Sequence, residues 1–168
     1  KKVPMLNRHI RALSERLVQG EPLTHNMLSW AKQHVEWSLA EGDYTARDGV
    51  LMLVIDINGN AAMTVGEYEP LADTSAKALR ARSAEARSEA DETGVAPELL
   101  AAVDNGELAF VAPADECLCG TATLIEQLAQ TKGIPVARVD IPAQLKGALF
   151  LVSDEHGVVP ATEADAAE

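Results

Sequence analysis

Residues 116–136 read ECLCGTATLIEQLAQTKGIPV, a turn followed by a short helix and a buried strand. Gly120 permits backbone angles that other residues avoid, and hydroxyls follow at Thr121 and Thr123. The next apolar residues fall on one helical face, at Leu124, Ile125, Leu128 and Ala129. Gly133 ends the helix, and the chain then runs extended. A helix placed between strands in this way predicts a mixed α/β (α+β) domain.

The start of this helix is a candidate anion site. Its first backbone amides would point, unpaired, at whatever lies over Gly120, Thr121, Ala122 and Thr123. A helix N-terminus of this kind suits a phosphate or a carboxylate group. We therefore expect that a small anionic ligand, if the protein binds one, binds at these four residues. The alternative is that Thr121 only caps the helix, as threonine commonly does.

A second informative stretch is VLMLVIDI at residues 50–57, which is apolar on both faces. Asn58 and Gly59 follow as a hairpin turn, which predicts pairing with residues 61–65. Because both faces need cover, we expect residues 50–57 to form an interior strand. The expected architecture is a sheet with a central hairpin strand covered by helices.

Three more segments have the features of helices. The first has apolar residues at helical spacing, Leu6, Ile10, Leu13 and Leu17. Thr24 can cap the second, on which Trp30 and Trp37 are expected to be core residues. The third is rich in alanine and extends from a cap at Thr74 or Ser75 to about residue 90. Shorter extended segments are expected at 107–111, 134–141 and 148–152.

The length of 168 residues fits one α/β domain over residues 1–160, with lobes 1–72 and 73–160 as an alternative division. Residues 161–168 are rich in alanine and acid and are expected to be a disordered tail.

Composition excludes some partners. The formal net charge of -12 argues against nucleic acid, whose binding requires clustered Lys and Arg.

No apolar run is long enough to span a membrane and no signal-peptide pattern is present, so a cytoplasmic protein is expected. Cys117 and Cys119 are too close for an unstrained disulfide, and no histidine or carboxylate cluster completes a metal site with them. We therefore expect reduced thiols and no metal.

Several motifs resemble the class IV pyridoxal-phosphate aminotransferases, a family that includes branched-chain and D-amino-acid aminotransferases and aminodeoxychorismate lyase. Residues 4–13, PMLNRHIRAL, are similar to its segment of Leu, His, Arg and Leu, and residues 48–53 to its following strand. Residues 119–123, CGTAT, resemble the turn whose amides hold the cofactor phosphate. Segments between Leu128 and Pro160 are similar to the closing strands of the family.

The resemblance implies pyridoxal phosphate as a cofactor and Lys77 as the lysine that forms its Schiff base. The family's phosphate-binding arginine is replaced by Ala12, with Arg11 one place away. Its glutamate at the pyridine nitrogen, which keeps the ring able to accept electrons, has only Glu107 as a counterpart. These departures predict that ordinary transaminase chemistry has been lost.

A second resemblance is to the cytidine-deaminase fold, in the order of helices and strands. Cys117 and Cys119 lie near the zinc-ligand positions of that fold, but Lys77 and Leu79 stand where a ligand and the acid/base glutamate would be. This resemblance implies a deaminase fold without its zinc site.

Four functions remain open on the sequence. The first is an aminotransferase-like protein that binds a small phosphate- or carboxylate-bearing metabolite without transamination. The second is a pyridoxal-phosphate enzyme that acts through Lys77. The third is a non-catalytic homo-oligomer in which the apolar strands and the two tryptophans pack against a second copy. The fourth is the deaminase-like protein without zinc.

Overall fold

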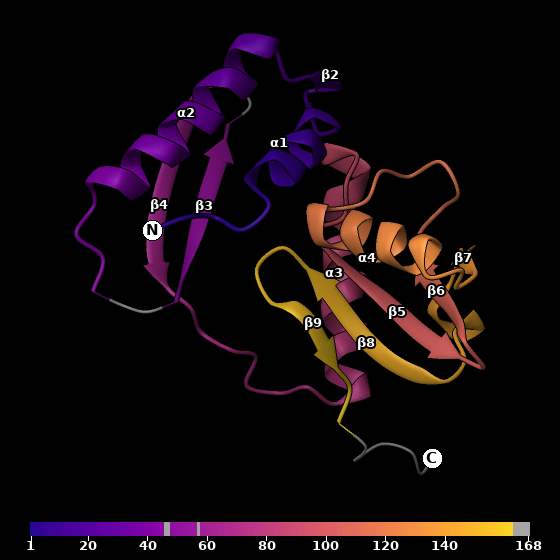
Figure 1. Ribbon diagram of the computed structural model, residues 1–168. Coiled ribbons are helices and arrows are strands. Elements are labelled where there is room, and N and C mark those ends of the chain that lie inside the picture. Colours follow the sequence, from indigo (N-terminus) through magenta and orange to yellow (C-terminus); the bar gives the residue numbers. More distant parts are fainter. Residues whose placement is uncertain (46–47, 57, 163–168) are drawn as a thin grey trace. The chain divides into compact units, whose positions relative to one another are not determined.

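A computed structural model describes residues 1–45, 48–56 and 58–162 (Figure 1). The chain divides into two compact units, Lys1–Pro70 and Leu71–Glu168. Helices and strands occur in both units, so the prediction of a mixed α/β fold is confirmed. Within the described residues, no helix is both long enough and apolar enough to cross a membrane.

The N-terminal unit contains α1 (Leu6–Ser14), β1 (Leu17–Val18), β2 (Glu21–Pro22), α2 (His25–Glu41), β3 (Gly49–Ile55) and β4 (Ala61–Glu67). Thr24 caps α2 as predicted, because its Oγ1 accepts a hydrogen bond from the Met27 amide at 3.2 Å. The buried residues of this helix are Ala31, Val35 and Leu39. The first helix is shorter than predicted: Leu17 lies in β1.

The tryptophan prediction is wrong for Trp37, whose exposed fraction is 58%. Trp30 is half-buried, and its ring stacks on that of His34 with 4.8 Å between centroids. The His34 ring in turn lies 6.0 Å from that of Trp37. These rings pack along the side of α2, beside its buried stripe.

The predicted hairpin is confirmed, with β3 and β4 antiparallel and Leu53 opposite Met63. Asp56 stabilises the turn by accepting hydrogen bonds from the amides of Asn58 and Asn60, both at 2.8 Å. The predicted interior position of this strand is wrong. Among the described residues β3 pairs with β4 alone, and Met52 and Val54 on its outer face are 53% and 52% exposed. Ile57 lies outside the described residues.

The C-terminal unit contains α3 (Ala76–Thr93), β5 (Glu98–Asp104), β6 (Glu107–Val111), α4 (Gly120–Thr131), β7 (Val136–Val139), the short 3-10 helix η1 (Pro142–Gln144), β8 (Ala148–Ser153) and β9 (Gly157–Pro160). Its strands form one sheet in the order β7-β6-β5-β8-β9. β6 and β7 are parallel, and the other neighbours are antiparallel. Ser75 caps α3, as predicted.

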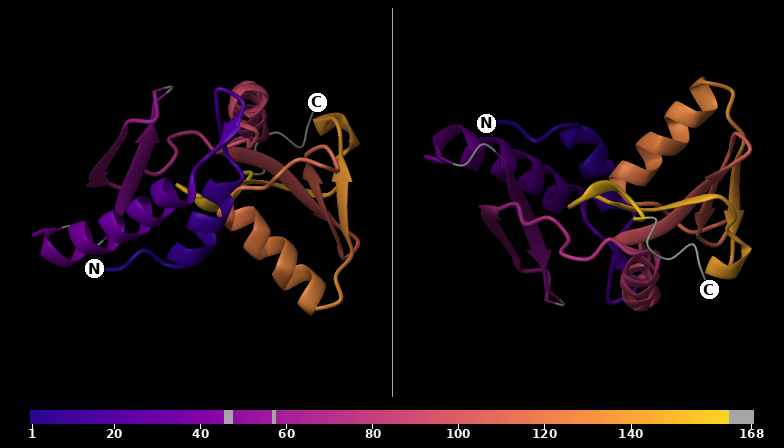
Figure 2. Two further views of the ribbon diagram at one scale, coloured as in Figure 1. Left: turned by 90° about the horizontal axis from the view of Figure 1, so that it is seen from above. Right: turned by 90° about the horizontal axis from the view of Figure 1, so that it is seen from below.

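Helices α3 and α4 lie on opposite faces of this sheet (Figure 2). Leu99 and Ala101 of β5 point to the α4 side and pack in one apolar cluster with Ala122. Leu100, between them, points to the α3 side and packs in a second cluster with Leu79. β5 therefore has strands on both sides and a helix on each face. The expected central hairpin strand exists, but it is β5 rather than β3.

The end of the described chain is fixed to this unit. The amide of Ala161 donates to the carbonyl of Leu149 at 2.9 Å, and that of Thr162 donates to Thr74 at 3.0 Å. These two residues begin the segment expected to be a tail, and residues 163–168 lie outside the described residues.

Candidate functional site

Helix α4 begins without a capping side chain from its own neighbourhood. Its N-cap residue is Cys119, which has extended backbone angles and makes no side-chain capping hydrogen bond. Thr121 is already inside the helix, and Thr123 donates from its hydroxyl to the Gly120 carbonyl at 2.7 Å. The alternative that Thr121 caps the helix is therefore wrong. The exposed amides at this start require another partner.

Asp154 provides that partner. Its Oδ1 accepts a hydrogen bond from the Thr121 amide at 2.7 Å and from the Thr121 hydroxyl at 2.8 Å. Its Oδ2 accepts from the Gly120 amide at 3.2 Å. Three donors thus converge on one carboxylate at the positive end of the α4 dipole. The helix start predicted to bind an anion holds an anionic side chain of the protein itself.

The topology explains how a residue so distant in sequence reaches α4. Asp154 lies in the turn of residues 154–156, which connects β8 to β9, and α4 packs across β8. The turn at the end of β8 is thereby carried to the first residues of the helix. The amide of His156 donates to Ser153 Oγ at 2.9 Å, which ties the end of this turn to its beginning.

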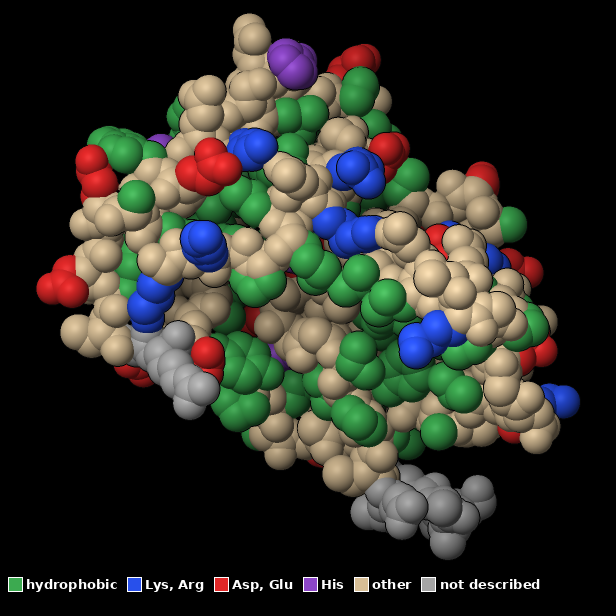
Figure 3. All heavy atoms as spheres, in the orientation of Figure 1, with side chains coloured by type: hydrophobic (Ala, Val, Ile, Leu, Met, Phe, Trp, Pro, Cys, Tyr) green, Lys and Arg blue, Asp and Glu red, His purple; other side chains and the backbone are tan. Residues whose placement is uncertain are grey.

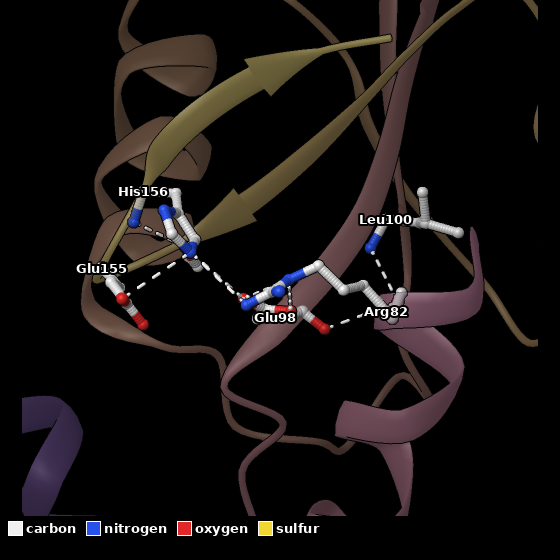
Figure 4. Close-up of polar contacts among 7 residues, drawn as sticks. Arg82, Glu98, Leu100, Glu155 and His156 are labelled. Carbon is white, nitrogen blue, oxygen red and sulfur yellow. Dashed lines mark hydrogen bonds and ion pairs between the residues drawn. The ribbon is translucent and has the colours of Figure 1, made fainter. Parts of the chain in front are cut away.

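The same turn places His156 in a partly buried polar cluster (Figure 4). Arg82 from α3 forms a bidentate pair with Glu98 at the start of β5, with Nε–Oε2 and Nη2–Oε1 distances of 2.8 Å. His156 Nε2 lies 3.4 Å from Arg82 Nη2 and 3.9 Å from Glu98 Oε1. The side chains of His156 and Glu98 are only 3% and 11% exposed. We call Arg82, Glu98, Glu155 and His156 the histidine cluster.

The charges in the histidine cluster stabilise one another. The pKa of Arg82 is raised above its ordinary value, chiefly because Glu98 accepts its hydrogen bonds, with further attraction from Glu155 and Glu85. Next to the pair, Ser83 donates to the Glu98 carbonyl at 3.4 Å and accepts from the Leu100 amide at 3.2 Å. Helix α3 is therefore fixed to the start of β5 by both charge and hydrogen bonds.

A second ion pair holds the loop that leads into α4. Arg87 pairs with Glu116 and also donates to the Val111 carbonyl at 2.7 Å. Arg138 donates to the Glu116 carbonyl at 3.0 Å and pairs with Glu126 of α4 at 3.3 Å. The other carboxylate oxygen of Glu116, Oε1, is buried and has no hydrogen-bond partner. This loop is anchored on both faces of the sheet and fixes where α4 begins.

The predicted site residues lie on several different elements. Gly120, Thr121, Ala122 and Thr123 form the first turn of α4, with Gly120 and Ala122 buried. Lys77 is an exposed residue at the start of α3, which covers the opposite face of the sheet. Arg11 is exposed on α1 and Glu107 is exposed at the start of β6.

These positions do not fit pyridoxal phosphate. A lysine that forms a Schiff base needs burial or a positive neighbour to lose its proton, and Lys77 is exposed. The sheet separates Lys77 from the start of α4, so one cofactor cannot contact both. A cofactor phosphate at Gly120 and Thr121 would also meet the carboxylate of Asp154.

The cysteines offer no metal centre within the described residues. No disulfide joins Cys117 and Cys119, and the described residues contain no group of three His, Cys, Asp or Glu side chains suited to a metal ion. Lys77 is exposed and Leu79 is fully buried, so the positions that the deaminase resemblance singled out do not form a ligand set.

The polar contacts at the start of α4 and in the histidine cluster come from residues that the sequence did not single out for chemistry: Arg82, Glu98, Asp154 and His156. A glutamate at the start of an apolar strand, as at Glu98, is the signal that could have indicated a buried charge requiring a cation.

No family model matches this chain, and no curated protein matches it. Two solved structures are similar in outline. One, assigned as an amino-acid aminotransferase from Mesorhizobium loti, shares 21% identity with a TM-score of 0.45, over 77% of this chain and 80% of that chain. The other, assigned as a 4-amino-4-deoxychorismate lyase, shares 18% identity with a TM-score of 0.44, over 90% of this chain and 83% of that chain. Similarity this low establishes neither an activity nor a ligand.

Proposed function

We propose that this protein binds a small carboxylate- or phosphate-bearing metabolite at the start of α4 and does not carry out ordinary transamination. One observation supports the binding: two amides and a hydroxyl, from Gly120 and Thr121, converge on the carboxylate of Asp154. The same donors suit the carboxylate or phosphate oxygens of an external ligand.

Such a ligand has to displace Asp154. A tethered group competes at an effective concentration on the order of millimolar, so a free carboxylate of equal intrinsic affinity binds only above that range. A phosphate carries more charge and more acceptor oxygens, and we expect it to compete better. By competing for the same donors, Asp154 weakens the binding of external anions in the unmodified protein and favours phosphate over carboxylate.

The test compares the unmodified protein with Asp154→Ala in titrations with inorganic phosphate and with acetate, followed by the backbone amide shifts of residues 120–123. Removing the competitor and its negative charge should tighten phosphate binding by roughly tenfold or more, equivalent to about 1.4 kcal/mol. Asp115→Ala, at an exposed aspartate in the loop before α4, is the matched control and should leave binding unchanged. If residues 120–123 stay still in Asp154→Ala while phosphate is added, the proposal is wrong.

The absence of transamination is supported by the position of Lys77, on the opposite face of the sheet from α4. Ala12 and the exposed Glu107 also leave the family's two other cofactor contacts without an equivalent. Assays for transamination with added pyridoxal phosphate and a panel of amino acids should therefore give no product. Product that disappears in Lys77→Ala would contradict this.

A second candidate function is self-association, favoured by the outer face of the β3–β4 hairpin. Met52 and Val54 expose more than half of their surface there, and Ala62, opposite Val54, is also exposed. Apolar surface is also exposed over β8 and β9, where Val158 lies (Figure 3). Light scattering should show a dimer that Met52→Thr with Val54→Thr dissociates, whereas Val103→Thr does not. A monomer at all concentrations would exclude this function.

A further inference from the structure

The contact with Arg82 defines the protonation state of the His156 ring. Its Nε2 lies 3.4 Å from Nη2 of Arg82, and a guanidinium group can only donate hydrogen bonds. Nε2 must therefore be the acceptor, so the ring is neutral and carries its proton on Nδ1. A proton added to Nε2 would set two donors against each other and abolish this contact.

Two carboxylates lie close enough to His156 to pair with its ring when the ring is protonated. Glu98 Oε1 is 3.9 Å and Glu155 Oε1 is 3.8 Å from His156 Nε2. Glu98 is already engaged by the bidentate contact with Arg82. Glu155 is 47% exposed, and its oxygens can move toward the ring. Protonation should therefore transfer His156 from Arg82 to Glu155.

The surrounding charges permit the ring to take up a proton. Arg82 faces His156 from α3, Glu98 faces it from β5, and Glu155 precedes it in the turn. With a neutral ring these groups comprise one cation and two carboxylates. A proton taken from solvent onto Nε2 reduces that excess of negative charge.

The turn links this change to the start of α4. Asp154 and His156 are two residues apart in the same short turn, and one is hydrogen-bonded to α4 while the other contacts α3 across the sheet. The Ser153 hydroxyl also accepts from the His156 amide, so the turn is tied at both ends. Glu155 Oε1 is already 3.8 Å from His156 Nε2, and both residues follow Asp154 directly in the chain, so a closer pairing between them acts on the turn that positions Asp154.

We propose that His156 is a pH-dependent latch on the α4 anion site. When neutral, it holds the turn with Asp154 on the amides of Gly120 and Thr121; when protonated, it pairs with Glu155 and releases Asp154. The release of Asp154 does not depend on the function proposed above. Only its consequence, that an external anion can then bind, rests on that function.

The test follows the amide shifts of Gly120 and Thr121 and the ring protons of His156 between about pH 8 and about pH 5.5, the range in which imidazole groups titrate. We expect the two amides to move with the same midpoint as the His156 ring. In His156→Gln, which cannot titrate, that movement should be lost. In Glu155→Gln, which removes the carboxylate that would pair with a protonated ring, the amides should respond much less.

His25→Gln, at an exposed histidine of the N-terminal unit, is the matched control and should not alter the amide titration. The latch is refuted if the amides stay still while the His156 ring titrates, or if they move equally in His156→Gln. Because the unmodified protein supplies both midpoints, the result stands even where a variant fails to fold. No anion is added, so failure of phosphate binding in Asp154→Ala leaves this result unaffected and refutes only the proposed function.

Discussion

Thr121 donates two hydrogen bonds to Asp154, from its amide at 2.7 Å and from its hydroxyl at 2.8 Å, across 33 residues of sequence. An N-cap side chain usually comes from the residue just before the helix. Here Cys119 occupies that position and makes no such bond, and the cap comes from the turn between β8 and β9. The stability of α4 therefore depends on the tertiary fold.

Asp154→Asn should destabilise the C-terminal unit by about 1 kcal/mol, because the amide removes the negative charge from the positive end of the α4 dipole and weakens its hydrogen bonds. Urea denaturation followed by circular dichroism measures the change. Asp115→Asn changes an exposed aspartate that precedes α4 and should have little effect. Equal stability of the two variants would show that the Asp154 contact contributes nothing.

Arg82→Ala should destabilise the protein by about 2 kcal/mol, below the range for breaking a fully buried pair because the Arg82 side chain is 40% exposed. The cost arises because Glu98 remains buried without its cation. Arg80→Ala is the control. It removes an exposed arginine two residues earlier on α3, which donates to the Pro142 carbonyl at 3.3 Å, and it should change the stability little. Matching urea midpoints for the two variants would contradict this assignment.

Lys77 should form no specific adduct with pyridoxal phosphate. Its exposed position gives no reason for it to react faster than other surface lysines. Borohydride trapping followed by peptide mass spectrometry should find label spread over several lysines, and Lys77→Ala should not reduce the total. Stoichiometric label on Lys77 alone would show that the cofactor fits after all.

Asn60→Ala should raise the pKa of Asp56 toward its ordinary value of 3.8. That pKa is lowered in the folded protein, first of all because the Asn60 side chain donates a hydrogen bond to the carboxylate at 2.9 Å. The folded value lies below the unfolded one, so the stabilisation is present above about pH 3.8 and is lost as pH falls through the lowered pKa.

Carboxyl carbon shifts measure this titration. Asp73 is the internal control, since its lowered pKa comes chiefly from the Ser75 amide and should stay the same in Asn60→Ala. An unchanged pKa of Asp56 in the variant would mean that the backbone amides alone account for the shift.

Local sequence determined most of the secondary structure. Thr24 and Ser75 cap their helices, and Asp56, Asn58 and Gly59 close the β3–β4 hairpin. Each of these features depends on hydrogen bonds between residues at most a few positions apart, so the pattern of neighbours is enough to predict it. The first turn of α4 was located for the same reason.

Only the tertiary structure decided which strand is central and what occupies the start of α4. Residues 50–57 and β5 are both apolar, but whether a strand gains partners on one side or on two depends on the sheet order. Likewise, Asp154 reaches Thr121 and His156 reaches Arg82, 74 residues away, because β8 lies beside β5 with α3 and α4 on opposite faces. The sequence supplies these polar residues, but the distances between them exist only once the sheet has assembled, since hydrogen bonds and ion pairs require contact in space.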